Sequence, residues 1–111
     1  MKPRSAKAKG RRLQDKVAKD IVDTFSIPEE SVRGAIMGES GTDIKIDYSL
    51  RQTIPYSIEC KNQERVNVWG AIKQSESNCK EGTTPIVIIK KNNVQPWVLV
   101  PWDHFLELIN K

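Results

Sequence analysis

A chain of 111 residues with 38% hydrophobic and 29% charged residues has the size and composition of one soluble globular domain. No apolar run approaches the roughly 18–20 residues of a membrane helix, and the basic N-terminus lacks the apolar stretch of a secretory signal. Two cysteines and one histidine are too few for a disulfide framework or a four-ligand structural zinc site. We therefore expect a cytoplasmic protein with no membrane partner.

The formal net charge of +4 is distributed unevenly along the chain. Residues 1–19 hold eight Lys or Arg against one Asp, whereas residues 20–111 hold ten against thirteen Asp or Glu. A basic segment on a mildly acidic body is typical of a protein that binds a polyanion. A tail that only keeps the protein soluble has the same composition, so charge alone leaves both interpretations open.

The first predicted element is a flexible arm over residues 1–9, because this stretch has no hydrophobic periodicity. The folded domain is then predicted to span residues 10–111. It begins with an amphipathic helix over residues 10–25, in which apolar residues recur every four positions, namely Leu13, Val17, Ile21 and Phe25.

Three strands are predicted next, over residues 32–37, 42–48 and 56–61. In the second and third, apolar and polar residues alternate, which indicates strands with one buried face and one polar face. Glu59 and Lys61 must share the polar face of the third strand, because residues two apart on a strand point the same way.

The C-terminal half continues as helix, two strands and helix. Asn67 is a candidate N-cap for a helix over residues 68–80. The β-branched run at residues 86–89 predicts a central strand covered on both faces. A strand over residues 97–100 and a helix over residues 102–110 complete the order α–β–β–β–α–β–β–α, which is an α/β fold with a central mixed sheet flanked by helices.

The polar faces of the second and third strands carry the residues with chemical potential. Asp43 on one strand and Glu59 with Lys61 on its neighbour would converge. Paired carboxylates suit Mg²⁺ or Mn²⁺, and a lysine beside them can orient a water or offset charge on a phosphate. Alternating charges also mark the solvent face of a half-exposed sheet, which is the simpler interpretation of any single Glu-x-Lys.

Two segments, Gly41-Thr42-Asp43 and Ile58-Glu59-Cys60-Lys61, resemble the core motif of PD-(D/E)XK nucleases. Within that superfamily the chain is similar to small phage endonucleases and archaeal-type Holliday-junction resolvases, with Gly10-Arg11-Arg12-Leu13 leading the first helix. The resemblance implies a restriction-endonuclease-like core. It also implies a metal held by Asp43, Glu59 and the backbone carbonyl of Cys60, with Lys61 as a catalytic residue.

Three further residues are candidates for the same site. Gln74 lies on the helix after the motif, where the superfamily often places a polar residue. Gln14 stands where resolvases usually carry a glutamate, and would supply a neutral oxygen. Glu39 in the turn before Asp43 would supply a third carboxylate, or is an exposed turn residue. On the helix, Gly70, Ala71, Gln74 and Asn78 form a stripe that permits either close approach to the site or tight helix–sheet packing.

The resemblance implies a Mg²⁺-dependent DNA endonuclease without a small-molecule cofactor. It would act as a homodimer on branched or single-stranded DNA in phage recombination or genome processing, in a bacterial or phage-infected cytosol. The residues expected to contact DNA are basic: Lys7, Lys9, Arg11, Arg12 and Lys73. The alternative is a non-catalytic nucleic-acid-binding module that retains the nuclease fold.

Overall fold

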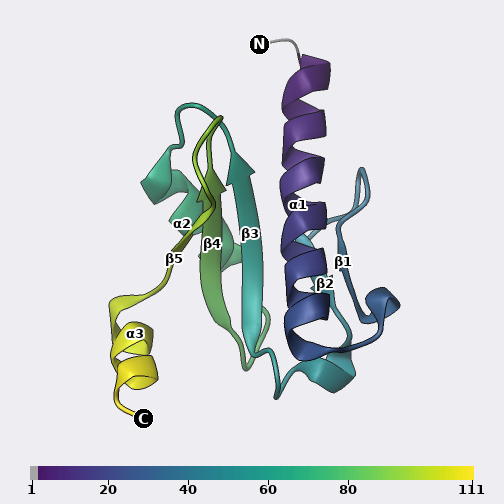
Figure 1. Cartoon of the computed structure of the whole chain (residues 1–111). Coiled ribbons are helices and arrows are strands. Elements are labelled where there is room, and N and C mark those ends of the chain that lie inside the picture. The colour runs from purple at the N-terminus through teal and green to yellow at the C-terminus, as the bar shows by residue number, and fades with distance from the viewer. Residues whose placement is uncertain (1–2) are drawn as a thin grey trace.

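The elements of the chain occur in the predicted order (Figure 1). A computed structural model describes the backbone of residues 3–111 and the side chains of residues 6–111. Its helices are α1 (Pro3–Phe25), α2 (Val68–Ser77) and α3 (Trp102–Ile109). Its strands are β1 (Val32–Gly34), β2 (Ile44–Ile46), β3 (Tyr56–Asn62), β4 (Thr84–Lys90) and β5 (Trp97–Leu99). The α/β class is therefore confirmed.

The first helix is longer than predicted. It starts at Pro3, so residues 3–9 are helical and do not form the flexible arm that the missing periodicity suggested. Lys and Ala have high helix propensity, and Gly10 costs only about 1 kcal/mol relative to Ala inside a helix. This part of α1 is also tied to the body, because Asn62 Nδ2 donates to the Lys9 carbonyl at 2.9 Å. Met1 and Lys2 of the predicted arm lie outside the described residues.

The predicted single central sheet is divided into two. β1 and β2 form an antiparallel pair, and the second sheet has the order β3-β4-β5, with β3 parallel to β4 and β4 antiparallel to β5. The two sheets meet at one backbone hydrogen bond, from Asp43 N to the Ile58 carbonyl at 3.1 Å. β2 is only three residues long, since a turn precedes it and a 3₁₀ turn (Tyr48–Leu50) follows shortly after it.

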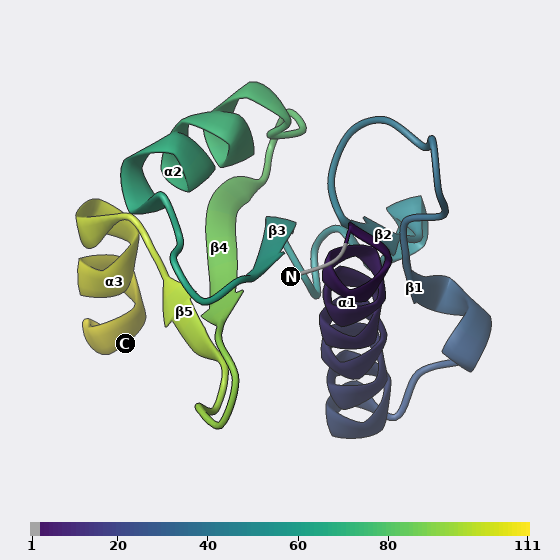
Figure 2. The same ribbon diagram turned by 90° about the horizontal axis from the view of Figure 1, so that it is seen from above.

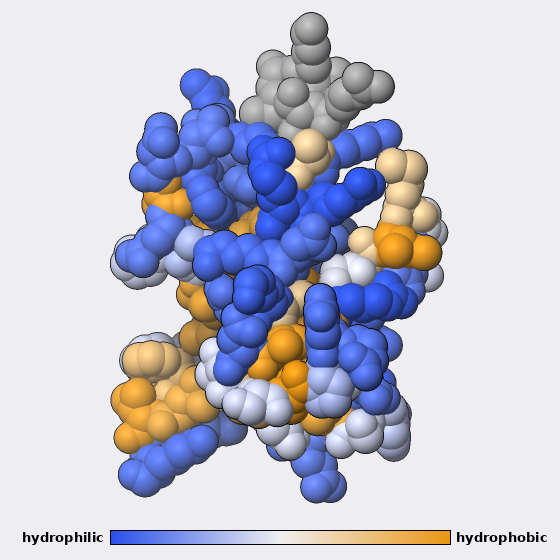
Figure 3. Space-filling model, turned by 45° about the vertical axis from the view of Figure 1, so that its right-hand side comes forward, coloured by the Kyte–Doolittle hydropathy of each residue, from blue (hydrophilic) through white to orange (hydrophobic). Residues whose placement is uncertain are grey.

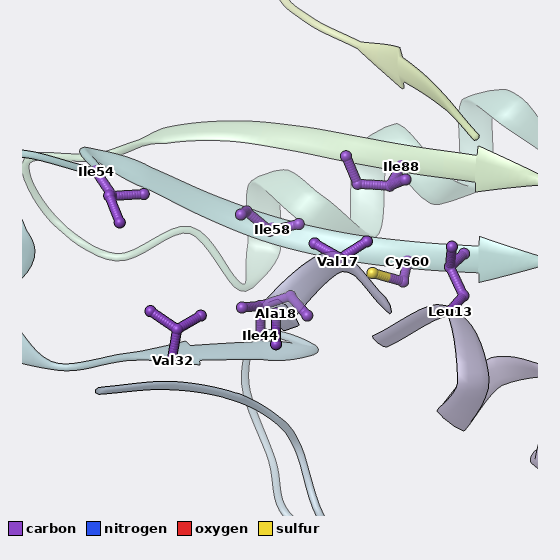
Figure 4. Close-up of a cluster of buried hydrophobic side chains, with 9 residues drawn as sticks. All are labelled: Leu13, Val17, Ala18, Val32, Ile44, Ile54, Ile58, Cys60 and Ile88. Carbon is purple, nitrogen blue, oxygen red and sulfur yellow. The ribbon is translucent and has the colours of Figure 1, made fainter. Parts of the chain in front are cut away.

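The hydrophobic core lies between α1 and the strands. Leu13, Val17 and Ala18 of α1 pack with Ile44 of β2 and with side chains of β1, β3 and β4 (Figure 4). Phe25, the last member of the predicted stripe, is instead 46% exposed. None of the helices within residues 3–111 is long and apolar enough to cross a membrane.

The second face of β3 is also covered. Figure 2 shows α2 over one face of the sheet β3-β4-β5, α1 beside β3, and α3 beyond β5. Val87 and Ile88, which point to opposite faces of β4, are both buried, so the prediction of a strand covered on both faces is confirmed for the middle of β4, whereas Ile86 and Ile89 are half-buried. On β3 the polar residues Ser57 and Glu59 are buried as well, at 4% and 1% exposure. Glu59 is therefore not part of a solvent-facing polar strand, and its carboxyl group needs another explanation.

Candidate active site

Two backbone-anchored contacts place Asp43 against the middle of β3. Its amide donates to the Ile58 carbonyl, and its Oδ2 accepts a hydrogen bond from the Cys60 amide at 2.8 Å. Because Ile58 and Cys60 flank Glu59 on β3, these contacts hold the Asp43 carboxylate beside Glu59. Gly41 makes this approach possible, because its φ of 91° lies in the left-handed region that other residues rarely adopt. The predicted convergence of the two acids is thus present in the structure.

The Glu59 carboxyl is buried and only half satisfied. Asn78, the C-cap residue of α2, donates a hydrogen bond from its Nδ2 to Glu59 Oε1 at 3.0 Å. The other oxygen, Oε2, is buried without a hydrogen-bond partner among the described residues. The pKa of Glu59 is raised to about 7, mainly by burial and also by the neighbouring Asp43 carboxylate, although the hydrogen bond from Asn78 lowers it. A buried acceptor left unpaired costs about 1–3 kcal/mol, so this oxygen marks a position where a positive ligand would be stabilised.

Lys61 lies on the same face of β3, two residues beyond Glu59. Its Nζ donates to Gln74 Oε1 of α2 at 2.8 Å, which directs the lysine along the edge of the site. Lys61 is also close enough that its charge lowers the pKa of Glu59. The strand therefore presents the Glu59 carboxylate and the Lys61 ammonium group side by side. Asn78, at the end of α2, positions Glu59, and Gln74 of α2 positions Lys61.

The donor set fits a hard divalent cation such as Mg²⁺. Asp43 and Glu59 supply carboxylate oxygens, and Mg²⁺ is typically held by one or two carboxylates with water or substrate oxygens as its other ligands. Among the described residues there is no group of three or more His, Cys, Asp and Glu that could hold a metal ion, so a cation here would rely on the pair. The Cys60 thiol does not take part, because it packs into the core and burial raises its pKa.

Two further predicted site residues, Glu39 and Gln14, contact residues of β1. Both carboxylate oxygens of Glu39 accept hydrogen bonds from Arg33 at 2.9 Å, and one also accepts from the Ile36 amide at 3.0 Å. These contacts lower the pKa of Glu39 to about 2. They tie the β1–β2 loop, in which Glu39 lies, to Arg33 of β1. The Gln14 side chain packs against Gly34, where an added Cβ would come within 3.0 Å of Gln14 Cβ. Within residues 6–111 no side-chain hydrogen bond joins Gln14 to Asp43, Glu59 or Lys61.

The basic residues divide into exposed and buried ones. Lys7, Arg11, Arg12 and Lys73 are exposed, and Lys7 and Arg11 line a surface hollow of about 370 Å³ together with Met37. Lys9 is 6% exposed, and its Nζ lies 3.5 Å from Glu64 Oε2. Lys9 is therefore enclosed by the protein, and its contact with DNA stays a prediction. Lys9 lies four residues before Leu13 and therefore on the buried stripe of α1. The spacing from Leu13 and Val17 could have predicted that Lys9 is buried.

Asn78 is the residue that sequence reasoning did not assign to the acids. Its place in the stripe with Gln74 was visible at a spacing of four residues, but nothing local shows which acid on β3 it meets. The buried Ala71 and Ser75 let α2 lie close enough to the sheet for that contact. The cluster is thus built from β3, α2 and the segment before β2. No family model, curated protein or solved structure matches the chain, so the cluster itself is the basis for its chemistry.

Proposed function

We propose that this protein is a Mg²⁺-dependent DNA endonuclease of the PD-(D/E)XK type. One observation carries the proposal: the buried carboxyl group of Glu59 lies beside that of Asp43 and has one oxygen without a hydrogen-bond donor among the described residues, with Lys61 two residues further along the strand. Without a ligand at this point, ionised Glu59 would be a buried carboxylate next to the half-buried carboxylate of Asp43, which is costly. A divalent cation removes that cost. The mixed sheet with α1 and α2 on its two sides supports a nuclease-like core.

Each residue of the cluster has a role in this proposal. Asp43, Glu59 and the Cys60 carbonyl would hold Mg²⁺, which when bound supplies Lewis acidity toward a phosphodiester. Lys61 donates a hydrogen bond to the attacking water and offsets negative charge that develops on the phosphate. Gln74 is a positioning residue, because it acts through Lys61. Asn78 donates a hydrogen bond to one oxygen of Glu59, so the other oxygen would be available to hold the cation.

The DNA would lie across the exposed basic residues of α1 and α2, namely Lys7, Arg11, Arg12 and Lys73. Contacts from such side chains to phosphates position a nucleic acid without reading its bases. Because such contacts leave the base sequence unread, we propose branched or single-stranded DNA as the substrate. A homodimer acting on two strands belongs to the same proposal.

Cleavage of a labelled panel of four-way junction, flap, duplex and single strand, with and without Mg²⁺, tests the proposal. We expect Mg²⁺-dependent nicking that Lys61→Ala abolishes and Gln74→Ala reduces. Lys19→Ala is the matched control, since Lys19 is exposed on α1 and pairs with Asp23. Nicking by Lys61→Ala at the wild-type rate would refute the assigned chemistry. Salt-dependent DNA binding without any cleavage would support the non-catalytic alternative instead.

A further inference from the structure

One buried polar side chain of β3 has no role in the chemistry described above. Hydrophilic residues dominate the surface of the protein, as Figure 3 shows for one face of the molecule. Ser57 is instead 4% exposed, and it points to the same face of β3 as Glu59, because the two residues are two apart on the strand. A buried hydroxyl needs hydrogen-bond partners, and those of Ser57 come from the segment that follows α2.

The hydrogen bonds of Ser57 form a closed ring. The Lys80 amide donates to Ser57 Oγ at 3.0 Å, and Ser57 Oγ lies 2.6 Å from Thr83 Oγ1. Thr83 Oγ1 lies 2.6 Å from the Lys80 carbonyl, which can only accept, so the Thr83 hydroxyl donates there. Because each hydroxyl has one hydrogen, Ser57 must donate to Thr83. Each hydroxyl therefore donates once and accepts once within the ring.

The ring fixes the turn between α2 and β4. The Thr83 amide also donates to the Lys80 carbonyl, at 3.1 Å, so residues 80–83 form a tight turn. The Thr84 amide, next along the chain, donates to the Pro55 carbonyl at 2.9 Å, just before β3 and β4 begin to pair. The turn is therefore held to the start of β3 by one backbone hydrogen bond and by the ring.

The segment that the ring holds also carries Asn78. Ser57 and Glu59 lie roughly 7 Å apart along β3, and the Lys80 amide meets the first while Asn78 meets the second. Two contacts therefore align the residues after α2 against one face of β3. Because α2 ends at Ser77, Asn78 lies between the helix end and the ring, and both determine where its side chain lies.

We propose that Ser57 and Thr83 are positioning residues of the candidate site, whose ring holds Asn78 on Oε1 of Glu59 and so leaves Oε2 to a cation. The proposal deepens the proposed function, and its statement about the cation rests on that function. Both hydroxyl hydrogens are used within the ring, so the two residues act on the site through Asn78. Removal of a group that orients a metal ligand typically weakens metal binding by about 10–100-fold. Since the ring acts one step further away, we expect an effect of about tenfold.

Four substitutions separate the ring from folding stability. Ser57→Ala removes one hydroxyl of the ring, and Thr83→Val removes the other with little change of shape. Thr83→Ser keeps the hydroxyl and should preserve the ring. Ser75→Ala is the matched control, because Ser75 is 3% exposed but its hydroxyl donates to the Ile72 carbonyl within α2. Either ring variant alone is sufficient, so the test remains decisive if the other fails to fold.

The first measurement is a proton–nitrogen NMR spectrum of the side-chain amides in the metal-free protein. We expect the Asn78 resonances of Ser57→Ala and Thr83→Val to move toward those of an unbonded amide, and their hydrogens to exchange faster with water. In Thr83→Ser and Ser75→Ala the resonances should keep their wild-type positions. Unchanged Asn78 resonances in the ring variants would overturn the proposal.

The second measurement is the affinity for Mg²⁺, by isothermal titration calorimetry. We expect the ring variants to bind Mg²⁺ about tenfold more weakly than the wild type, and Thr83→Ser and Ser75→Ala to bind it equally well. A ring that only supports folding would lower the Tm of Ser57→Ala and Ser75→Ala alike and leave their affinities equal, which would overturn the proposal. A wild type that binds no Mg²⁺ would instead refute the proposed function, while the NMR spectrum still decides whether the ring positions Asn78.

Discussion

Replacement of Glu59 by Gln separates two effects of the buried carboxylate: its cost to folding stability and its proposed role in holding Mg²⁺. In the metal-free protein the pKa of Glu59 is raised from 4.5 to about 7, with burial as the main cause. The folded state therefore binds a proton more tightly than the unfolded state. The stability that this proton contributes is complete below pH 4.5 and is lost as the pH rises through 7.

The size of the effect follows from the shift. Ionising Glu59 in the folded state costs about 3 kcal/mol at pH 8 but under about 1 kcal/mol at pH 5, where the folded protein still holds the proton. Gln has the same shape as Glu and keeps an oxygen that accepts the hydrogen bond from Asn78. Its amide nitrogen would replace Oε2, which has no partner among the described residues, and can donate a hydrogen bond from that position. Glu59→Gln should thus stabilise the metal-free protein by up to about 3 kcal/mol at pH 8, or about 13 °C in Tm.

Thermal unfolding in EDTA at the two pH values measures this difference. Glu76→Gln, which removes an exposed carboxylate from the same helix as Gln74, is the control and should change stability by less than about 0.5 kcal/mol. Saturating Mg²⁺ should reverse the ranking, because only the wild type then gains binding free energy. Equal gains at pH 5 and pH 8, or a loss at pH 8, would show that Glu59 is not a strained carboxylate.

Three further predictions follow from other contacts. Gln14→Glu should keep or raise Mg²⁺-dependent cleavage, whereas Gln14→Leu should impair turnover if the amide reaches the site. Normal turnover of Gln14→Leu would show that Gln14 only packs against Gly34. The double variant Lys7→Ala with Arg11→Ala should flatten the slope of log K for DNA against log salt by about 2, without changing the Tm, and an unchanged slope would remove the hollow from the DNA path. Asn67→Ala should destabilise the protein by about 1 kcal/mol in urea unfolding, because Asn67 caps α2 through the Gly70 amide at 3.0 Å.

The order of elements was readable from local pattern alone. The spacing of Leu13 and Val17 and the cap at Asn67 each depend on neighbours within a few residues, and both are present in the folded protein. The pairing of Asp43 with Glu59 was also anticipated, because two adjacent polar strand faces constrain where their acids can meet.

What local pattern could not decide was which surfaces end up covered. Burial of Lys9 and Glu59 depends on contacts from Asn62 and Asn78, which lie 53 and 19 residues away along the chain. The capture of Glu39 by Arg33 depends likewise on how the β1–β2 loop closes. Composition and periodicity determined this protein's helices, strands and candidate acids. Only tertiary packing decided which charges lost their water, because desolvation depends on everything that surrounds a side chain and not on its sequence neighbours.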